Sequence, residues 1–101
     1  MAFVRAASQG EIPAGTIREL HLAGRTIALA NVEGRFYAID NTCLHRGGPL
    51  GQGKLEGKVV TCPVHGWQYD VTTGQVTFSP EMAVRTYPVE LRGDEIYVDA
   101  G

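Results

Sequence analysis

Short stretches of strand-forming residues alternate with glycine-containing turns along most of the chain. Three such stretches follow one another at residues 17–22, 26–32 and 36–39. The pairs Ala23-Gly24 and Glu33-Gly34 separate them, and both are typical of hairpin turns because glycine accepts a positive φ without steric cost. These stretches predict a three-stranded antiparallel meander.

Apolar and polar positions alternate within the second stretch. Ile27 and Leu29 fall on one side of a strand, whereas Thr26 and Ala28 fall on the other. This period of two is typical of a sheet that packs against a core. We therefore expect one of the two faces of this sheet to be buried.

Strands are also expected near both ends of the chain. Residues 3–6 predict a first strand, and a regular pattern returns at 84–91 and 95–98 around a turn at 92–94. Between these parts glycine and proline are dense and the apolar stretches are short. We expect one all-β domain, residues 1–101, with a loop-rich insert at about 40–80 inside a β frame of residues 1–39 and 81–101.

The composition excludes several classes of partner. The 9 basic and 11 acidic residues are spread without long runs, so neither a nucleic-acid patch nor an arm for anionic membranes is expected. No apolar stretch approaches the roughly 20 residues that span a bilayer, and the first six residues lack the features of a secretory signal. We expect a soluble, cytoplasmic monomer whose partners are proteins.

The strongest chemical signal is a repeated pairing of cysteine with histidine. Cys43-Leu44-His45 and Cys62-Pro63-Val64-His65 contain both cysteines and two of the three histidines of the chain. In a reducing compartment thiols more often serve metal binding or catalysis than a disulfide. The two segments therefore predict one shared metal site. His21 has no cysteine or second histidine at loop spacing, so we leave it out of the site.

Two occupants suit such a donor set, a tetrahedral zinc ion or a binuclear iron–sulfur cluster. Cys₂His₂ zinc modules usually place cysteine with cysteine and histidine with histidine. Here each segment is mixed, which suits a diiron cluster in which one iron takes both cysteines and the other both histidines. The order of the ligands favours the cluster over zinc.

The surrounding residues extend this pattern into a longer motif. The sequences from Cys43 to Leu50 and from Cys62 to Asp70 together resemble the Rieske [2Fe-2S] motif. The resemblance implies an antiparallel β-sandwich or barrel with a small cluster-binding subdomain. It also implies that Cys43 and Cys62 bind the inner iron, and that His45 and His65 bind the outer iron near the surface.

The same resemblance gives expectations for neighbouring residues. Tyr69 stands where high-potential relatives have a tyrosine whose hydroxyl reaches a ligand sulfur, but Trp67 stands where they carry a serine. Gly48 and Val64 occupy the places of the cysteine pair that cross-links the loops of respiratory Rieske proteins. A low potential within the Rieske range is therefore expected. Ser79-Pro80 is the expected proline-bearing segment over the cluster.

The loop glycines have two possible roles. Gly47, Gly48 and Gly66 can present backbone N–H groups to sulfur, or they can simply form turns. Both roles stay open from the sequence alone.

The predicted function is electron transfer rather than catalysis. An oxygenase subunit needs an additional mononuclear iron on a 2-His-1-carboxylate set, and only His21 remains once His45 and His65 are assigned. The resemblance implies a Rieske ferredoxin that carries single electrons from an NAD(P)H-dependent flavin reductase to a terminal oxygenase, such as an aromatic-ring dioxygenase. Transient docking is expected near His45 and His65, on a surface formed with the following residues: Arg46, Pro49, Leu50, Gly66 and Trp67.

Two alternatives remain open at this point. The chain could be the small Rieske-like subunit of an NAD(P)H nitrite reductase, in which case it would be part of a stable complex. It could also be a zinc-stapled β module that binds proteins.

Overall fold

The computed structural model describes residues 2–45, 47–64 and 66–100, and the strands in these ranges form three antiparallel sheets. The first sheet contains β1 (Phe3–Ser8), β12 (Glu95–Asp99) and β11 (Val89–Arg92). The second contains β10 (Thr86–Tyr87), β4 (Arg35–Asp40), β3 (Arg25–Val32) and β2 (Ile17–Leu22). The third contains β5 (Lys54–Glu56), β6 (Val59–Thr61), β7 (Gln68–Asp70), β8 (Gln75–Val76) and β9 (Ser79–Ala83). The predicted all-β fold class is confirmed.

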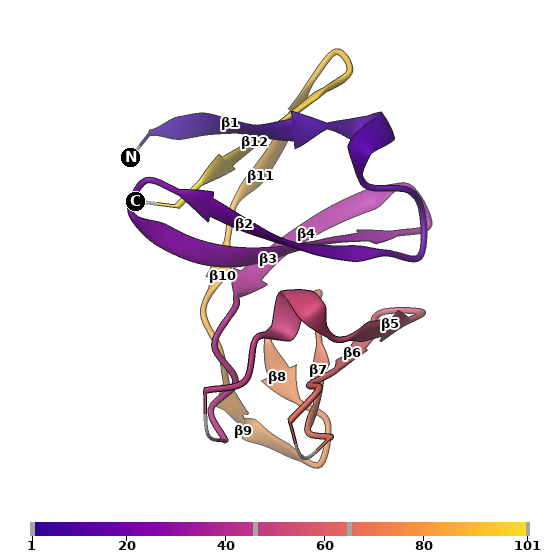
Figure 1. Ribbon diagram of the computed structural model, residues 1–101, viewed down its shortest axis with the longest axis vertical. Coiled ribbons are helices and arrows are strands. Elements are labelled where there is room, and N and C mark those ends of the chain that lie inside the picture. Colours follow the sequence, from indigo (N-terminus) through magenta and orange to yellow (C-terminus); the bar gives the residue numbers. More distant parts are fainter. Residues whose placement is uncertain (1, 46, 65, 101) are drawn as a thin grey trace.

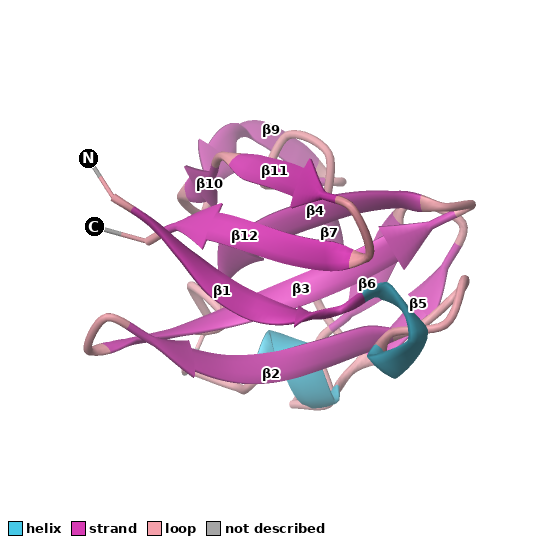
Figure 2. Cartoon of the chain, turned by 90° about the horizontal axis from the view of Figure 1, so that it is seen from above, coloured by secondary structure: helices cyan, strands magenta, loops and turns pink. Residues whose placement is uncertain are grey.

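The three sheets follow one another along the long axis of the molecule (Figure 1). The first sheet lies over the strands β2, β3 and β4 of the second sheet (Figure 2). The third sheet lies at the opposite end, together with the short 3-10 helix η2 (Leu50–Gln52) (Figure 1). A second 3-10 helix, η1 (Gln9–Glu11), follows β1.

The predicted meander is present as β2, β3 and β4, which pair in sequence order. Its two turns have a positive φ at both central residues: 49° and 77° at Ala23 and Gly24, and 53° and 91° at Glu33 and Gly34. Such turns match the right-handed twist of the strands that they join. The turns are thus confirmed, although alanine and glutamate share the left-handed conformation with the glycines.

The expectation of one buried face was wrong for β3, because this strand is buried on both sides. Ile27 and Leu29 pack into a core shared with the first sheet. Ala28 and Ala30 pack into a second core, which contains both cysteines and the side chains of the third sheet. Small apolar side chains at alternate positions allow a second layer to approach that face, so β3 is the wall between two cores.

The predicted strand at 84–91 was also wrong as a single element. The chain forms β10 in the second sheet and then β11 in the first sheet, with Pro88 between them. Proline has no N–H to donate to a ladder, so it interrupts a strand where the chain changes sheet. The Pro88 carbonyl still accepts a hydrogen bond from the Asp99 N–H at 3.1 Å.

The segment 41–85, which contains the third sheet, leaves and rejoins the second sheet at adjacent points. It leaves where β4 ends at Asp40, and the Asp40 N–H donates to the Arg85 carbonyl at 2.9 Å. Thr86, the first residue of β10, pairs with Ile39 of β4. Two neighbouring strands therefore fix both ends of the part of the chain that carries the two cysteines.

Candidate metal centre

Two loops with the same backbone closure carry the cysteines. In the first loop, residues 43–48, the Cys43 N–H donates to the Gly48 carbonyl at 2.8 Å. In the second loop, residues 62–67, the Cys62 N–H donates to the Trp67 carbonyl at 2.7 Å. The repeat in the sequence thus corresponds to a repeat in backbone structure, and both loops lie at the end of the molecule opposite the first sheet (Figure 1).

The loop glycines shape the backbone more than they serve the sulfurs. Gly47 and Gly66, each the fifth residue of its loop, have positive φ values of 67° and 74°. The Gly47 N–H donates to the Cys43 carbonyl at 3.0 Å, so it is used within the loop. Among the described residues, the Val64 N–H donates to Cys62 Sγ at 3.4 Å.

The two cysteine side chains are buried next to each other, and neither forms a disulfide. Burial raises the pKa of the Cys62 thiol, and the neighbouring Cys43 thiol raises it further, whereas the Val64 N–H acts in the opposite direction. Two adjacent buried thiolates repel each other, so both ionise readily only beside a positively charged group. The pair therefore fits a metal centre that binds thiolates.

The expected contact between Tyr69 and a cysteine sulfur is present. The Tyr69 hydroxyl lies 3.2 Å from Cys43 Sγ and accepts a hydrogen bond from the Leu44 N–H at 2.9 Å. Because its oxygen accepts from Leu44, the hydroxyl proton is available to the sulfur. Burial raises the pKa of Tyr69, and the Cys43 side chain raises it further, so the hydroxyl remains protonated and able to donate.

Gly48 holds the two loops close together. A Cβ at this position would lie 2.6 Å from Cys62 Sγ and 3.1 Å from the side chain of Val64. In this chain, a side chain at position 48 would force Cys62 or Val64 to shift. The absence of a side chain at Gly48 therefore suits the close packing of the two loops around these residues.

Three aromatic rings meet beside the first loop. The imidazole of His45 and the indole of Trp67 are stacked with centroids 4.7 Å apart and planes at 6°. The ring of Phe78 meets the indole edge-on, at 4.9 Å and 87°. His65 and Arg46 lie outside the described residues. Within the ranges that the structure describes, no three His, Cys, Asp or Glu side chains are gathered as a metal-binding group.

Sequence reasoning missed two exposed apolar residues near the loops and misplaced a third. Leu44 in the first loop and Phe78 before β9 are 49% and 63% exposed. Leu50, expected on the docking surface, is fully buried in the core of the third sheet, so that expectation was wrong. An apolar residue next to His45, such as Leu44, gives no sign of its exposure in the sequence, because the same residue type fills the cores.

Ser79 and Pro80 begin β9. Their expected position over the cluster is not tested, but Phe78, the residue before them, contacts Trp67. His21 lies on β2 with its Nδ1 3.0 Å from the Thr26 hydroxyl oxygen.

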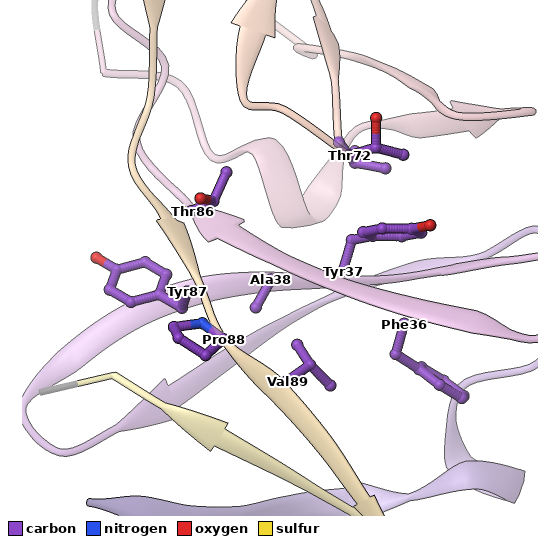
Figure 3. Close-up of a pocket in the computed structure, with 9 residues that line it drawn as sticks. Phe36, Tyr37, Ala38, Thr72, Thr86, Tyr87, Pro88 and Val89 are labelled. Carbon is purple, nitrogen blue, oxygen red and sulfur yellow. The ribbon is translucent and has the colours of Figure 1, made fainter. Parts of the chain in front are cut away.

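A shallow pocket of about 440 Å³ lies elsewhere, against β4, β10 and β11 (Figure 3). Its lining contains aromatic, threonine and small apolar side chains, among them Tyr37, Thr72 and Tyr87, and neither cysteine nor histidine. The pocket is therefore separate from the two loops.

Comparison with known proteins assigns the family. The model of the Rieske [2Fe-2S] domain matches residues 2–88. This chain belongs to the Rieske [2Fe-2S] domain family. It is 38% identical over 90 residues to the ferredoxin component of the naphthalene 1,2-dioxygenase system of Pseudomonas aeruginosa, with 88% of this chain and 86% of that protein covered.

Solved structures show the same Rieske fold. The ferredoxin of carbazole 1,9a-dioxygenase from Nocardioides aromaticivorans IC177 is 29% identical with a TM-score of 0.89, and 97% of each chain is covered. A complex of reduced oxygenase and oxidized ferredoxin in carbazole 1,9a-dioxygenase contains a chain that is 33% identical, with a TM-score of 0.87. That match covers 95% of this chain and 91% of the other.

These findings confirm the predicted Rieske family, its [2Fe-2S] cofactor and its antiparallel β fold. The relatives are electron-transfer components of dioxygenase systems, which confirms the predicted class of ferredoxin rather than enzyme. A related ferredoxin is found in a complex with its oxygenase. Among the described residues, no helix has the length and apolar character needed to cross a membrane.

The described residues fit the cofactor that the Rieske family implies. A Rieske cluster takes thiolate and imidazole ligands. The described residues offer two adjacent buried thiols, two donors to their sulfurs and a half-buried imidazole in the first loop. Gly48 leaves the space between the loops that a side chain would fill. The assignment of the four ligands stays a prediction.

Proposed function

We propose that this Rieske protein is a cytoplasmic one-electron carrier and that Cys43, His45, Cys62 and His65 hold its cluster. The observation that carries the proposal is the pair of adjacent buried cysteines in two loops of identical closure. The electron would come from an NAD(P)H-dependent flavin reductase and pass to a terminal oxygenase of the aromatic-ring dioxygenase type. The names of the relatives support both the carrier role and the type of system.

The residues around the site prepare it for this chemistry. When bound, the [2Fe-2S] cluster accepts and releases one electron at a time. The Tyr69 hydroxyl donates a hydrogen bond to Cys43 Sγ, and the Val64 N–H donates one to Cys62 Sγ. Both hydrogen bonds stabilise negative charge added to the sulfurs. Burial of both sulfurs keeps water from them. His45 is only half-buried, so it is the described ligand that a partner can approach.

We place the docking surface at the same end of the molecule. Leu44 and Phe78 are exposed there, and both belong to segments that contact the His45–Trp67 pair or adjoin it. Exposed apolar side chains next to a redox site suit the small, transient contacts of an electron carrier. This surface keeps the predicted place near His45 and leaves out only Leu50, which is buried.

The cofactor assignment is tested by spectroscopy of the purified protein. We expect two irons and two inorganic sulfides per chain, and an EPR signal on dithionite reduction. His65→Cys and His45→Cys should each change the spectrum, whereas the control His21→Ala should not. A single zinc ion with no iron, or a spectrum altered only by His21→Ala, would refute the proposal.

The carrier role is tested by stopped-flow electron transfer to a purified oxygenase of the naphthalene dioxygenase type. Leu44→Ser should lower the second-order rate constant by about fivefold or more, as loss of an interface anchor does. Leu91→Ser is the matched control, because Leu91 is 47% exposed and lies on β11 in the first sheet, at the other end of the molecule. Equal rate constants for the two variants would exclude docking at the loops.

A further inference from the structure

The aromatic contact between the two loops links their positions. His45 belongs to the first loop and Trp67 closes the second, since its carbonyl accepts the Cys62 N–H. The second loop therefore fixes the backbone of Trp67, and the face of its indole lies against the His45 ring. Phe78, in the turn between β8 and β9, contacts the indole from a third segment.

We propose that Trp67 is a positioning residue that sets the ring plane of His45, and that Phe78 holds the indole in place. The inference rests on the proposed ligand role of His45. A ligand imidazole can turn about its bond to the metal, and it needs a neighbouring group to fix its orientation. A parallel contact with planes at 6° restricts that rotation, because turning the imidazole would drive its edge into the indole.

The position of Trp67 supports this role. Its side chain is half-buried and packs against the core that contains Cys43, Cys62 and Tyr69. Both this core and Phe78 therefore hold the indole in place. Trp67 occupies the sixth place of the second loop, where the first loop has Gly48. At this place, Gly48 of the first loop allows the two loops to approach each other, whereas Trp67 of the second loop contacts the His45 ring.

Phe78 contributes to the site through its contact with Trp67 rather than through its own burial. Phe78 is 63% exposed, so it gains little from burial. Its edge-on contact limits the movement of the indole, and through it the movement of His45. Removing Phe78 should therefore affect His45 through the indole of Trp67.

The test is pulsed EPR of the reduced holoprotein, which measures the ¹⁴N hyperfine couplings of the ligand imidazoles. Trp67→Ala should broaden the coupling assigned to His45, with other ring orientations about two- to tenfold more populated, the range that aromatic pairs contribute. Trp67→Phe should largely restore the narrow coupling. Phe78→Ala should give an intermediate width. Tyr97→Ala, an aromatic deletion on β12, is the control and should leave the coupling unchanged.

Each outcome decides the proposal. An unchanged coupling in Trp67→Ala, or a failure of Trp67→Phe to restore it, overturns the positioning role. If Trp67→Ala does not retain its cluster, Phe78→Ala decides, because an exposed side chain can be removed without unfolding: broadening supports the proposal and an unchanged width overturns it. Wild-type protein without imidazole couplings would instead refute the proposed ligands.

Discussion

The two cysteine loops close with the same hydrogen bond, but different parts of the molecule support them. The second loop joins β6 to β7, and its ends are held by the direct pairing of Thr61 with Gln68. At the ends of the first loop, Thr42 and Pro49 also pair, but as an isolated bridge outside any strand. This loop relies in addition on residues far away in the sequence. Tyr69 contacts Cys43 and Leu44 across more than twenty positions.

Asn41 provides the other support of the first loop. Its buried side chain donates to Glu19 on β2 and accepts from the Gly51 N–H at 2.7 Å, which fixes η2 against the second sheet. Gly51 fits so tightly that an added Cβ would lie 2.7 Å from the Glu19 Cα. The two loops repeat in sequence, but their structures do not depend equally on the rest of the fold. The first loop should be the more sensitive of the two to distant substitutions.

The largest effect is expected from adding a methyl group between the loops. Gly48→Ala places a Cβ 2.6 Å from Cys62 Sγ, so it should destabilise the protein by about 1–3 kcal/mol and remove most of the bound iron. The control Gly66→Ala has no atom within 4 Å of the new Cβ and only a backbone cost of about 1–2 kcal/mol at its positive φ. Iron content per chain checks this, and equal contents would contradict the steric role of Gly48.

A second prediction compares two buried asparagines, each 6% exposed. Asn41→Ala leaves the Gly51 N–H without its acceptor, and Asn31→Ala leaves the Gly34 N–H without its acceptor. Each should cost about 1–3 kcal/mol of unfolding free energy, measured by denaturant titration. Only Asn41→Ala should also speed the loss of iron to a chelator, because only Asn41 supports the first loop. Equally fast loss of iron from both variants would contradict a specific role of Asn41 in supporting the first loop.

A third prediction concerns the midpoint reduction potential of the [2Fe-2S] cluster. Tyr69→Phe removes the hydroxyl from Cys43 Sγ, so the reduced state loses stabilisation and the midpoint potential should fall. A hydrogen bond to a charged group worth about 1.5 kcal/mol corresponds to about 65 mV for one electron. Tyr87→Phe, which removes a hydroxyl that donates to Asp40, is the matched control. Voltammetry showing equal potentials for the two variants would count against a donor role for Tyr69.

The smallest effect concerns acid stability near the second loop. Burial alone would raise the pKa of Asp70 at the end of β7, but hydrogen bonds from Thr72 and the nearby Lys58 ammonium outweigh it and lower the pKa. The stability that Asp70 contributes is therefore fully present above the ordinary value of about 3.9 and is lost as pH falls through the lower folded value. Asp70→Asn should be less stable than wild type by less than about 1 kcal/mol above pH ~5.

Denaturant titrations at several pH values check this dependence. The difference between wild type and Asp70→Asn should shrink below pH ~4. A difference that grows toward acid would mean that the pKa of Asp70 is raised, not lowered.

The sequence predicts those parts of the fold that depend on local chemistry. The turns at Ala23-Gly24 and Glu33-Gly34 follow from glycine next to strand-forming residues, and the spacing within the Cys43 and Cys62 segments predicts the metal site. Such features need only neighbouring residues, so they can be predicted before the chain is folded.

The features that were missed depend on contacts between distant segments. Ala28 and Ala30 look like an exposed face until the third sheet covers them. Leu50 is buried because Asn41 and Glu19 hold η2 in place, and Phe78 gains a role only where β8 and β9 bring it to Trp67. None of these contacts leaves a periodic signal in the sequence.

The adjacent ends of segment 41–85 make it suited to transplantation between scaffolds. The Asp40 N–H meets the Arg85 carbonyl, so an antiparallel strand pair of ordinary spacing offers the same attachment points. A recipient would also need small residues where Ala28 and Ala30 receive the second core. Grafting onto such a sheet would transfer both cysteine loops and the proposed docking surface together, whatever the rest of the host protein.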